Sequence, residues 1–361
     1  GITKISVSVV FISILLLVIT SSLAITDKSN GIIDNMKVVS ETKNNIKVTW
    51  YPIFVGLVDK EYNITIEMNK MVKISIVVIF DQLRDDLFRL LETIRPQLNK
   101  EVEILLVQES DKEIQLPALP VKTRHIIIPQ KQGFSFNRNQ GIKNSKGNII
   151  VFIDDDCWVH EKWLEAITKP LLDNKNVMVT ASGTIIPKST FLGDCISELG
   201  FPGGGSLGFR NVWPISQEGF TDHLVVGNCA IKKEVFNKIG MFEEAMKSGA
   251  EDAEMSMRLK QSGIHILYVE EAYAYHKART KLGDFIKWQI RRGRANFQFK
   301  TKLGKVDEFV KLRLWSTKNI IKKNLLRPRL AIILCLLILS FLTQNYGYLK
   351  EKSWAILTNA S

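Results

Sequence analysis

Long apolar runs, separated by segments with helical spacing, limit most strongly how this chain can fold. The runs "ISIVVIF" (residues 74–80), "VEILLV" (102–107) and "NIIVFI" (148–153) are almost continuously apolar and do not alternate with polar residues. Strands have this composition when helices cover both faces of a parallel sheet. The sequence therefore predicts an α/β domain in which helices flank a mostly parallel sheet.

The expected elements alternate along the chain. Residues 83–94 carry leucines at helical spacing and stop near Pro96. Residues 187–222 are expected to form a long loop, and a loop of this length inside a compact domain usually has a function. Further helices are expected at 136–143, 161–172, 233–239 and 251–261, and further strands at 125–128, 177–186 and 264–269.

Two hydrophobic stretches lie near the ends of the sequence. Residues 5–25 carry no charge over about the 20 residues that a bilayer requires, and residues 330–342 are apolar apart from Ser340 and continue without charge to Leu349. We interpret residues 1–26 and 330–349 as transmembrane segments. The alternative for the first is a cleaved signal peptide, since Ser22-Leu23-Ala24 resembles a signal-peptidase site.

The net charge of +12 comes from one segment. Residues 277–329 hold seventeen Lys and Arg against three acidic residues, which gives +14 and leaves the rest of the chain slightly acidic. This segment has no recognisable nucleic-acid-binding module and runs directly into a hydrophobic stretch, so its expected partner is a membrane surface and not nucleic acid. By the positive-inside rule, the basic residues before the second hydrophobic stretch place the domain in the cytoplasm.

These features divide the chain into five parts. Between the two hydrophobic segments, residues 27–70 are a polar linker to which we assign no role, and residues 71–300 form the α/β domain. Residues 301–329 are basic and amphipathic and are expected to lie at the membrane interface.

Three consecutive carboxylates, Asp154, Asp155 and Asp156, follow the third apolar run directly. Ligands of open parallel sheets bind at the carboxyl ends of the strands, which is where these residues are expected. Alternation along an extended chain sends Asp154 and Asp156 to one side and Asp155 to the other. Two converging carboxylates suit Mg²⁺ or Mn²⁺, whose shell is completed by water and phosphate oxygens. The alternative is that Asp155 and Asp156 cap the next helix or face water.

Several separated motifs resemble those of family 2 glycosyltransferases with the GT-A fold. They are "RNQGIKNSKGNIIVFIDDDCW" and, about a hundred residues later, "GAEDAEMSMRLKQSGIHILYVEEAYAYH". The resemblance covers about residues 73–294 and implies a GT-A type fold, here with hydrophobic membrane segments at both ends of the chain. In that family the aspartate motif holds a divalent metal that bridges the diphosphate of a nucleotide sugar, which by position falls on Asp154 and Asp156.

The resemblance assigns further roles by position. Glu251 and Asp252 match the pair that supplies the catalytic base, and we assign the base to Asp252 with Glu251 second. His276 matches a histidine that lies near the metal or the diphosphate in some members. The residues expected to contact the donor are Asp81, Glu109, Ser110, Asp111, Arg138, Asn139, Asp155, Arg291 and Arg292.

The chemistry of these residues fits such a donor, although each has a simpler explanation. Oxygen acceptors at residues 109–111 suit ribose hydroxyls, or they form a plain turn. Arg138 at a helix start suits a diphosphate, and Arg291 and Arg292 either neutralise the leaving diphosphate or face the membrane surface. Acidic residues in the first turn of a helix, such as Asp252, also stabilise that helix by ~0.3–1 kcal/mol.

The sequence thus predicts an inverting, membrane-anchored glycosyltransferase that uses a nucleotide-sugar donor and Mn²⁺ or Mg²⁺. Its expected acceptor is a hydroxyl of a lipid-linked molecule or of a growing surface glycan. The element "QIRRGR" lacks the Trp of processive members, which argues against processive polymer synthesis. One alternative is a nucleotidyltransferase, although "FDQLRDD" replaces the expected glycine-rich phosphate loop. The other is a non-catalytic membrane scaffold, which would have lost the acids that are present here.

Overall fold

The computed structural model describes residues 36–41, 45–50, 62–67, 72–82, 84–110, 119, 121–304 and 307–359. The chain divides into two compact units, Gly1–Lys70 and Met71–Ser361. In the first unit, β1 (Met36–Glu41), β2 (Asn45–Trp50) and β3 (Tyr62–Glu67) form an antiparallel sheet in that order. The predicted hydrophobic segment at residues 1–26 lies outside the described residues.

An eight-stranded sheet forms the centre of the second unit. Its strands are β4 (Ile74–Phe80), β5 (Val102–Gln108), β6 (Lys122–Ile127), β7 (Ile149–Ile153), β9 (Val179–Ala181), β11 (Phe220–Thr221), β12 (Asn228–Lys232) and β13 (Ile266–Tyr268). Their order across the sheet is β11-β13-β9-β12-β7-β4-β5-β6. Neighbours are parallel except that β12 is antiparallel to β7 and β9, and β11 to β13. The predicted mostly parallel sheet is confirmed.

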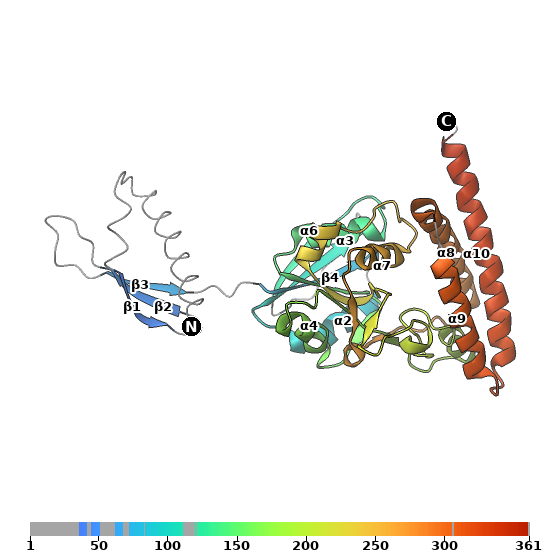
Figure 1. Cartoon of the computed structure of the whole chain (residues 1–361), viewed down its shortest axis with the longest axis horizontal. Helices are drawn as coiled ribbons and strands as arrows, with labels where there is room; N and C mark the ends of the chain where they lie inside the picture. The colour runs from blue at the N-terminus through green and yellow to red at the C-terminus, as the bar shows by residue number, and fades with distance from the viewer. Residues whose placement is uncertain are drawn as a thin grey trace. The chain divides into compact units, whose positions relative to one another are not determined.

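Helices cover both faces of this sheet, as Figure 1 shows. Strands β4, β5 and β7 are buried along their whole length, and their alternate side chains enter two different cores. Ile76, for example, packs in the core beneath α2 and α4, whereas its neighbour Val77 packs in the core beneath α3, α6 and α7. The helices are α2 (Asp85–Ile94), α3 (Phe134–Asn144), α4 (Trp163–Asp173), α6 (Lys233–Ile239) and α7 (Glu251–Gln261).

A second, three-stranded sheet lies beside the first, in the order β10-β14-β8. Its strands are β8 (Cys157–Val159), β10 (Thr184–Ile185) and β14 (Ala274–His276). The single strand predicted at 177–186 is therefore wrong, because the chain passes from β9 in one sheet to β10 in the other. Gly183 lies at this break, where an added Cβ would come within 2.9 Å of the carbonyl oxygen of Gly203.

The segment predicted as a long loop, residues 187–222, contains more regular structure than expected. It holds α5 (Phe191–Ser197), a 3-10 helix (Phe209–Asn211) and β11. Cys195, Ile196 and Trp213 from this segment are buried in a third apolar cluster. The segment is thus ordered by its own core, which its glycine-rich turns concealed in the sequence.

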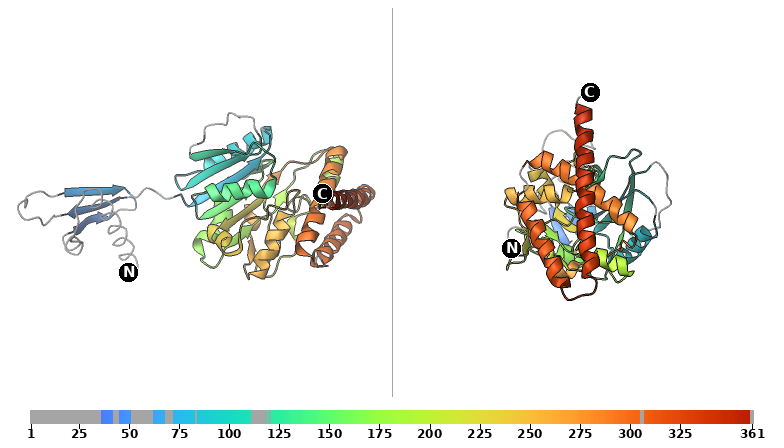
Figure 2. Two further views of the ribbon diagram at one scale, coloured as in Figure 1. Left: turned by 90° about the horizontal axis from the view of Figure 1, so that it is seen from above. Right: turned by 90° about the vertical axis from the view of Figure 1, so that its right-hand side faces the viewer.

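Three helices complete the chain: α8 (Leu282–Leu303), α9 (Asp307–Asn324) and α10 (Leu330–Asn359). The helix predicted at the basic amphipathic segment is confirmed as α9, whereas α8 was not predicted. Figure 2 shows α10 as the outermost layer, lying across α8 and α9. Among the described residues, Leu330–Leu357 is the one helix long and apolar enough to cross a membrane. The expectation of membrane segments at both ends is therefore corrected to one candidate helix within the described part of the chain.

Two glycines allow α8 and α10 to approach each other closely. A Cβ added at Gly293 would lie 2.0 Å from the carbonyl oxygen of Gln344, and one added at Gly347 would lie 2.1 Å from that of Ile290. Both obstacles are backbone atoms, which cannot rotate out of the way. The contact between the two helices therefore requires glycine at both positions.

We predict that Gly293→Ala lowers the free energy of unfolding by about 1–3 kcal/mol, because the new methyl group forces α8 and α10 apart. Gly283→Ala is the matched control, since Gly283 lies in the same helix with no atom within 4 Å of an added Cβ. The control should be neutral or stabilising by up to about 1 kcal/mol, because alanine favours helix over glycine. Urea unfolding followed by circular dichroism measures both variants, and equal effects would contradict the prediction.

Candidate active site

The acid triplet lies directly after β7, at the carboxyl end of the parallel strands. Its three side chains reach three different cationic or ionisable partners, which separates them from one another. The contacts are Asp154 to Arg138 at 3.4 Å, Asp155 to Arg84 at 3.8 Å and Asp156 to His276 at 3.0 Å. Burial and the two neighbouring carboxylates raise the pKa of Asp155 to about 7, against the effect of Arg84.

Asp156 and His276 come together because the three-stranded sheet pairs two strands that are distant in the chain. β8 follows the triplet and pairs antiparallel with β14, so Cys157 lies opposite His276. The imidazole Nε2 lies 3.0 Å from the Asp156 carboxylate, and Nδ1 lies 2.8 Å from the carbonyl oxygen of Lys277, which orients the ring. Burial opposes charge on both groups, but their attraction and hydrogen bond outweigh it. The pKa of Asp156 is therefore lowered and that of His276 raised.

This pair offers donor atoms that suit a divalent cation. A carboxylate oxygen is a preferred ligand of Mg²⁺ and Mn²⁺, and an imidazole nitrogen is a ligand of many transition metals. Asp156, Cys157 and His276 form the one group of this kind in the described residues, with ligand atoms within 4.8 Å of one another. Burial raises the pKa of the Cys157 thiol well above its usual range, so the sulfur stays protonated and is a poor ligand.

Arg138 connects the acid triplet to the start of α7. One of its guanidinium nitrogens lies 2.5 Å from Glu251 and another lies 3.4 Å from Asp154. Arg138 and Glu251 are each only 6% exposed. Burial raises the pKa of Asp154 and of Glu251, and the charge of Arg138 acts against that rise in both. Arg138 therefore allows the buried Glu251 and the partly exposed Asp154 to lie near each other.

The backbone beneath Asp154 is held rigidly. A Cβ added at Gly227 would lie 2.3 Å from an Asp154 carboxylate oxygen, so only glycine leaves room for that carboxylate. The next residue, Asn228, is fully buried, and its side chain bonds to the connection between β9 and β10, to the 3-10 helix before β14 and to α4. Its amide nitrogen donates to the carbonyl oxygens of Gly183 (3.0 Å) and Ala272 (2.8 Å), and its oxygen accepts from the indole of Trp163 (2.9 Å).

Asp252 lies in the first turn of α7, beside Glu251. One carboxylate oxygen accepts a hydrogen bond from the amide of Ala253 at 2.7 Å, and the side chain is 37% exposed. Burial raises the pKa of Asp252, although that hydrogen bond and the charges of Arg138 and Arg292 act in the opposite direction. Asp252 is thus the more accessible member of the pair, because Glu251 is covered and bound to Arg138.

His223 is a neighbour of Asp252 that the sequence analysis did not identify. Its Nε2 lies 3.9 Å from the second carboxylate oxygen of Asp252, and its ring stacks on Trp213 with centroids 4.1 Å apart. Burial and the nearby Arg313 and Arg292 lower the pKa of His223 to about 3, so the ring is neutral. A lone histidine in "TDHLVV" carried no pattern that marked it in the sequence.

Arginines stacked on aromatic rings lie on the side of the site that faces α8 and α9. Burial lowers the pKa of Arg279, Arg292 and Arg313, yet an arginine side chain stays cationic in a protein. Asp156 acts electrostatically on Arg279, and Asp252 on Arg292. The contacts are Arg279 and Arg292 over Trp288 (4.3 and 5.1 Å), Arg292 and Arg313 over Phe201 (4.3 and 4.6 Å), and Arg291 over Phe134 (5.2 Å).

The other predicted donor contacts are placed less uniformly. Asp81 is exposed and pairs with Arg84, which also approaches Asp155. Glu109 accepts hydrogen bonds from the backbone amides of Gln132 (2.7 Å) and Gly133 (2.6 Å), so it holds the loop that leads into α3. Ser110 follows Glu109 directly, and Asp111 lies outside the described residues.

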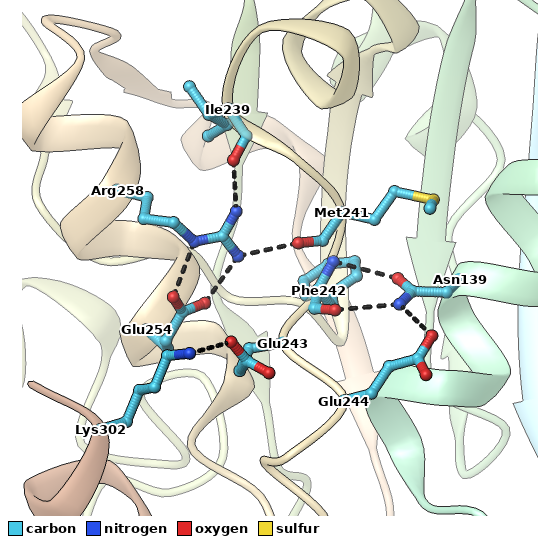
Figure 3. A pocket seen from close by; sticks show the side chains of 9 residues that line it. All are labelled: Asn139, Ile239, Met241, Phe242, Glu243, Glu244, Glu254, Arg258 and Lys302. Atoms are coloured by element: carbon cyan, nitrogen blue, oxygen red, sulfur yellow. Dashed lines mark hydrogen bonds and ion pairs between the residues drawn. The ribbon is translucent and has the colours of Figure 1, made fainter.

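Asn139 takes part in a second polar region, which lines a cavity of 580 Å³ (Figure 3). Its amide nitrogen donates to the carbonyl oxygen of Phe242 and to Glu244, and its oxygen accepts from the amide of Phe242. Neither the acid triplet nor Asp252 lines this cavity. The hydrogen bonds of Asn139 thus join α3 to the loop before α7, and its contact with a donor stays a prediction.

Ion pairs complete the walls of this cavity. Arg258 binds Glu254 through two nitrogens at 2.6 and 2.7 Å and donates to the carbonyl oxygens at the end of α6. Lys302 of α8 lies 2.5 Å from Glu243. These contacts fasten α6, α7 and α8 together, and we assign the region a structural role.

The comparisons with known proteins point to a family of glycosyltransferases. Residues 75–240 match the family described as Glycosyl transferase family 2. Glycosyltransferase AglE of Haloferax volcanii is 27% identical over 207 residues, which cover 54% of this chain and 63% of that protein. Polypeptide N-acetylgalactosaminyltransferase 11 of Xenopus tropicalis is 27% identical over 176 residues, 45% of this chain and 29% of that protein. The matches thus span less than two thirds of the length of these relatives.

A solved structure shares the fold. The mannosyltransferase PcManGT from Pyrobaculum calidifontis, in complex with GDP-Man and Mn²⁺, is similar with a TM-score of 0.53 and 13% identity, over 77% of this chain and 87% of that chain. The central sheet, its helical layers and the acids at the strand end define a GT-A-like α/β fold. The family match covers residues 75–240, and over this part the chain is similar to the transferases of glycosyl transferase family 2.

We predict that Arg138→Met lowers the free energy of unfolding by about 3–5 kcal/mol at pH 8, because the buried Glu251 loses its cationic partner and the partly exposed Asp154 loses a charged neighbour. The loss should shrink towards pH 5. Without Arg138 the folded-state pKa of Glu251, already raised by burial, rises further above its unfolded value, so the folded state binds the proton more tightly. Stability then falls as pH rises from the unfolded pKa through the folded pKa. Urea unfolding at the two pH values measures this difference.

Arg210→Met is the matched control for this experiment. Arg210 pairs with Glu270 at 3.0 Å, but both side chains are more than half exposed. Its removal should cost no more than about 1 kcal/mol at either pH. An equal loss at both pH values in the Arg138 variant would show that Glu251 and Asp154 do not depend on its charge.

Proposed function

We propose that this protein transfers a sugar from a nucleotide-diphosphate sugar to a hydroxyl group, with inversion at the anomeric carbon and with help from a divalent metal. The observation that carries the proposal is the link made by Arg138, which contacts both Asp154 of the triplet and Glu251 beside Asp252. The acids assigned to the donor and those assigned to the base therefore belong to one connected site. The family match and the GT-A-like fold support this assignment.

Asp156 and His276 are the residues best suited to hold the metal, and Asp154 lies two residues before Asp156 in the chain. Mn²⁺ is present in the structure of the mannosyltransferase PcManGT, which supports a divalent metal here without separating Mn²⁺ from Mg²⁺. When bound, such an ion would neutralise charge on the donor diphosphate as it leaves. Arg279, Arg291 and Arg292 provide fixed positive charge on the same side of the site for the same purpose.

Asp252 is our choice for the catalytic base. Its carboxylate is partly exposed, and a pKa raised by burial makes it a stronger base than an ordinary aspartate. The proton of the acceptor hydroxyl would pass to Asp252 while the hydroxyl oxygen bonds to the anomeric carbon from the face opposite the diphosphate. The bond between that carbon and the diphosphate oxygen breaks in the same step. His223 does not compete for the proton, because its pKa of about 3 lies far below a neutral pH and the ring stays neutral.

The acceptor and the location are the less constrained part of the proposal. The apolar helix α10 and the basic segment before it support a membrane-associated protein whose acceptor is lipid-linked or part of a surface glycan. The basic residues before α10 favour a cytoplasmic catalytic domain, because the cytoplasmic leaflet carries the anionic lipids that attract them. Nothing in the described residues favours the nucleotidyltransferase or the scaffold over this function, and the family match favours the transferase.

We predict that Asp252→Asn lowers the rate of sugar transfer by about 10²–10⁴-fold without weakening donor binding, because it removes the base and leaves the donor contacts in place. Incubation with a panel of UDP-, GDP- and dTDP-sugars plus Mn²⁺ measures hydrolysis and transfer, and calorimetry measures donor binding. Asp222→Asn is the matched control, since Asp222 is an exposed acid paired with Lys260. Full activity of the Asp252 variant would remove Asp252 from the mechanism.

We also predict that Asp156→Asn and His276→Ala each weaken Mn²⁺ binding at least about tenfold, which is ~1.4 kcal/mol. Electron paramagnetic resonance of free Mn²⁺ measures this directly and needs no substrate. His265→Ala serves as the control, because His265 is exposed and its ring contacts Phe220 of the edge strand β11. Unchanged Mn²⁺ affinity in both variants would place the metal elsewhere while leaving the assignment of the base open.

A further inference from the structure

The outward face of α10 is a continuous apolar surface. Ile338, Phe341, Leu342, Tyr346 and Leu349 recur at helical spacing and are between 56% and 67% exposed. Trp354, Ile356 and Leu357 extend the apolar surface to the end of the helix, at 60–69% exposure. A monomer surrounded only by water rarely leaves so large an apolar patch uncovered, so this face has a partner.

The opposite face of α10 packs against α5 and α8 along most of its length. Near its start, Ile333 and Leu336 are 0% and 3% exposed in the cluster that contains Cys195 and Ile196 of α5. Near its end, Glu351 accepts from Arg294 at 2.6 Å and from Gln298 at 2.7 Å. From residue 333 to 351 the helix rises ~27 Å, close to the ~30 Å thickness of a hydrocarbon core.

The middle of α10 contacts α8 through polar groups. Gln289 of α8 accepts hydrogen bonds from Ser340 at 2.9 Å and from Gln344 at 2.7 Å, and the two glycine contacts described above lie within a turn of this pair. The same stretch of α8 carries Lys287, Arg291 and Arg294, all exposed. Each charged side chain taken to the centre of a bilayer costs about 2.5–3.5 kcal/mol. A crossing α10 would either take these residues with it or lose the whole α8 interface.

We propose that α10 lies in the plane of an anionic membrane surface, with its outward apolar face buried among the lipids, and does not cross the bilayer. This inference rests on the membrane association included in the proposed function. Helices α9 and α10 also carry the cations that an anionic lipid surface requires. Exposed lysines are found along α9 and near the end of α10, at Lys311, Lys318, Lys322, Lys323, Lys350 and Lys352.

Helix α9 extends the lipid-facing surface. Leu314 is 67% exposed and Val310 49%, and Leu326, at the turn into α10, is 96% exposed. Glu198 of the catalytic unit binds Arg327 at 2.9 Å and Arg329 at 3.3 Å, which fixes the turn between the two helices. The apolar side chains of α9, the turn and α10 are therefore presented by a rigid support, as an interfacial element needs.

The depth of α10 in the membrane tests the proposal. Cys335 is the one exposed cysteine of the four in the chain, so a Cys335→Ser background accepts single nitroxide labels at Leu334→Cys, Leu342→Cys, Leu349→Cys and Ile356→Cys. The full-length protein is bound to vesicles with and without anionic lipid, and the accessibility of each label to oxygen and to a water-soluble nickel complex gives its depth. Leu172→Cys on α4, 53% exposed, is the control for a label in water.

A helix in the membrane plane places all four α10 labels at one shallow depth, about 5–10 Å below the headgroups, on anionic vesicles. A crossing helix instead gives a depth profile with its maximum of ~15 Å near Leu342 and with Leu334 and Ile356 at opposite surfaces, which would overturn the proposal. Labels as accessible to water as the α4 control would overturn it too, even if the chain remains attached through its hydrophobic residues 5–25. Strong coupling between labels of two molecules without lipid would assign the face to a second copy.

This experiment is independent of catalysis. The depth profile is obtained without donor or acceptor, whereas hydrolysis of a donor sugar is measured in solution without vesicles. A protein that hydrolyses the donor but shows a crossing or water-exposed α10 contradicts only the membrane arrangement. One with uniform shallow depth and no activity contradicts only the proposed chemistry.

Discussion

The candidate site depends on one buried cation. Arg138 lies between Asp154, at the end of β7, and Glu251, at the start of α7, and Glu251 follows Arg138 by 113 residues in the chain. Buried carboxylates repel one another and resist ionisation, so a group of acids can persist in a core only when a positive charge is placed among them. The position of α3, which carries Arg138, is therefore as important for the site as the strands that carry the acids.

The supports of the site come from parts of the fold with no chemistry of their own. Asn228 bonds to the β9–β10 connection, to the 3-10 helix before β14 and to α4, and Gly227 leaves the space that the Asp154 carboxylate occupies. The short pairing of β8 with β14 brings His276 to Asp156 across more than a hundred residues. These contacts hold the backbone that carries Asp154, Asp156 and His276, which limits how far these side chains can move.

Much of the architecture was accessible from the sequence because it follows from local periodicity. The buried strands β4 and β7 and the helices α6 and α7 were predicted to within a residue, since apolar runs and helical spacing are local signals. The antiparallel strand β12 and the helix α8 were missed. Strand direction is decided by pairing with β7 and β9, and α8 is so rich in Lys and Arg that its apolar stripe is obscured.

The acids of the site were likewise found from the sequence, whereas their partners were not. Asp154, Asp156 and Asp252 stand out through a motif or a family resemblance. His223 and Arg279 do not, because they come near Asp252 and Asp156 only in the folded chain, and the same is true of Arg313 on α9, which acts on His223. Asn139 illustrates the reverse case, since a residue of the matched motif is occupied by hydrogen bonds to Phe242 and Glu244.

Helix α8 contacts both the candidate site and α10, which bears on the acceptors that the proposed transferase can use. On one side it carries Arg292, which interacts electrostatically with Asp252, and on the other it is bound to α10 through Gln289 and Gly293. With α10 bound to lipid, α8 would set the height of the reaction centre above the bilayer. The proposed transferase would then select acceptors whose hydroxyl stands at that height above the membrane. A soluble sugar with the same hydroxyl would not be held at the site in this way.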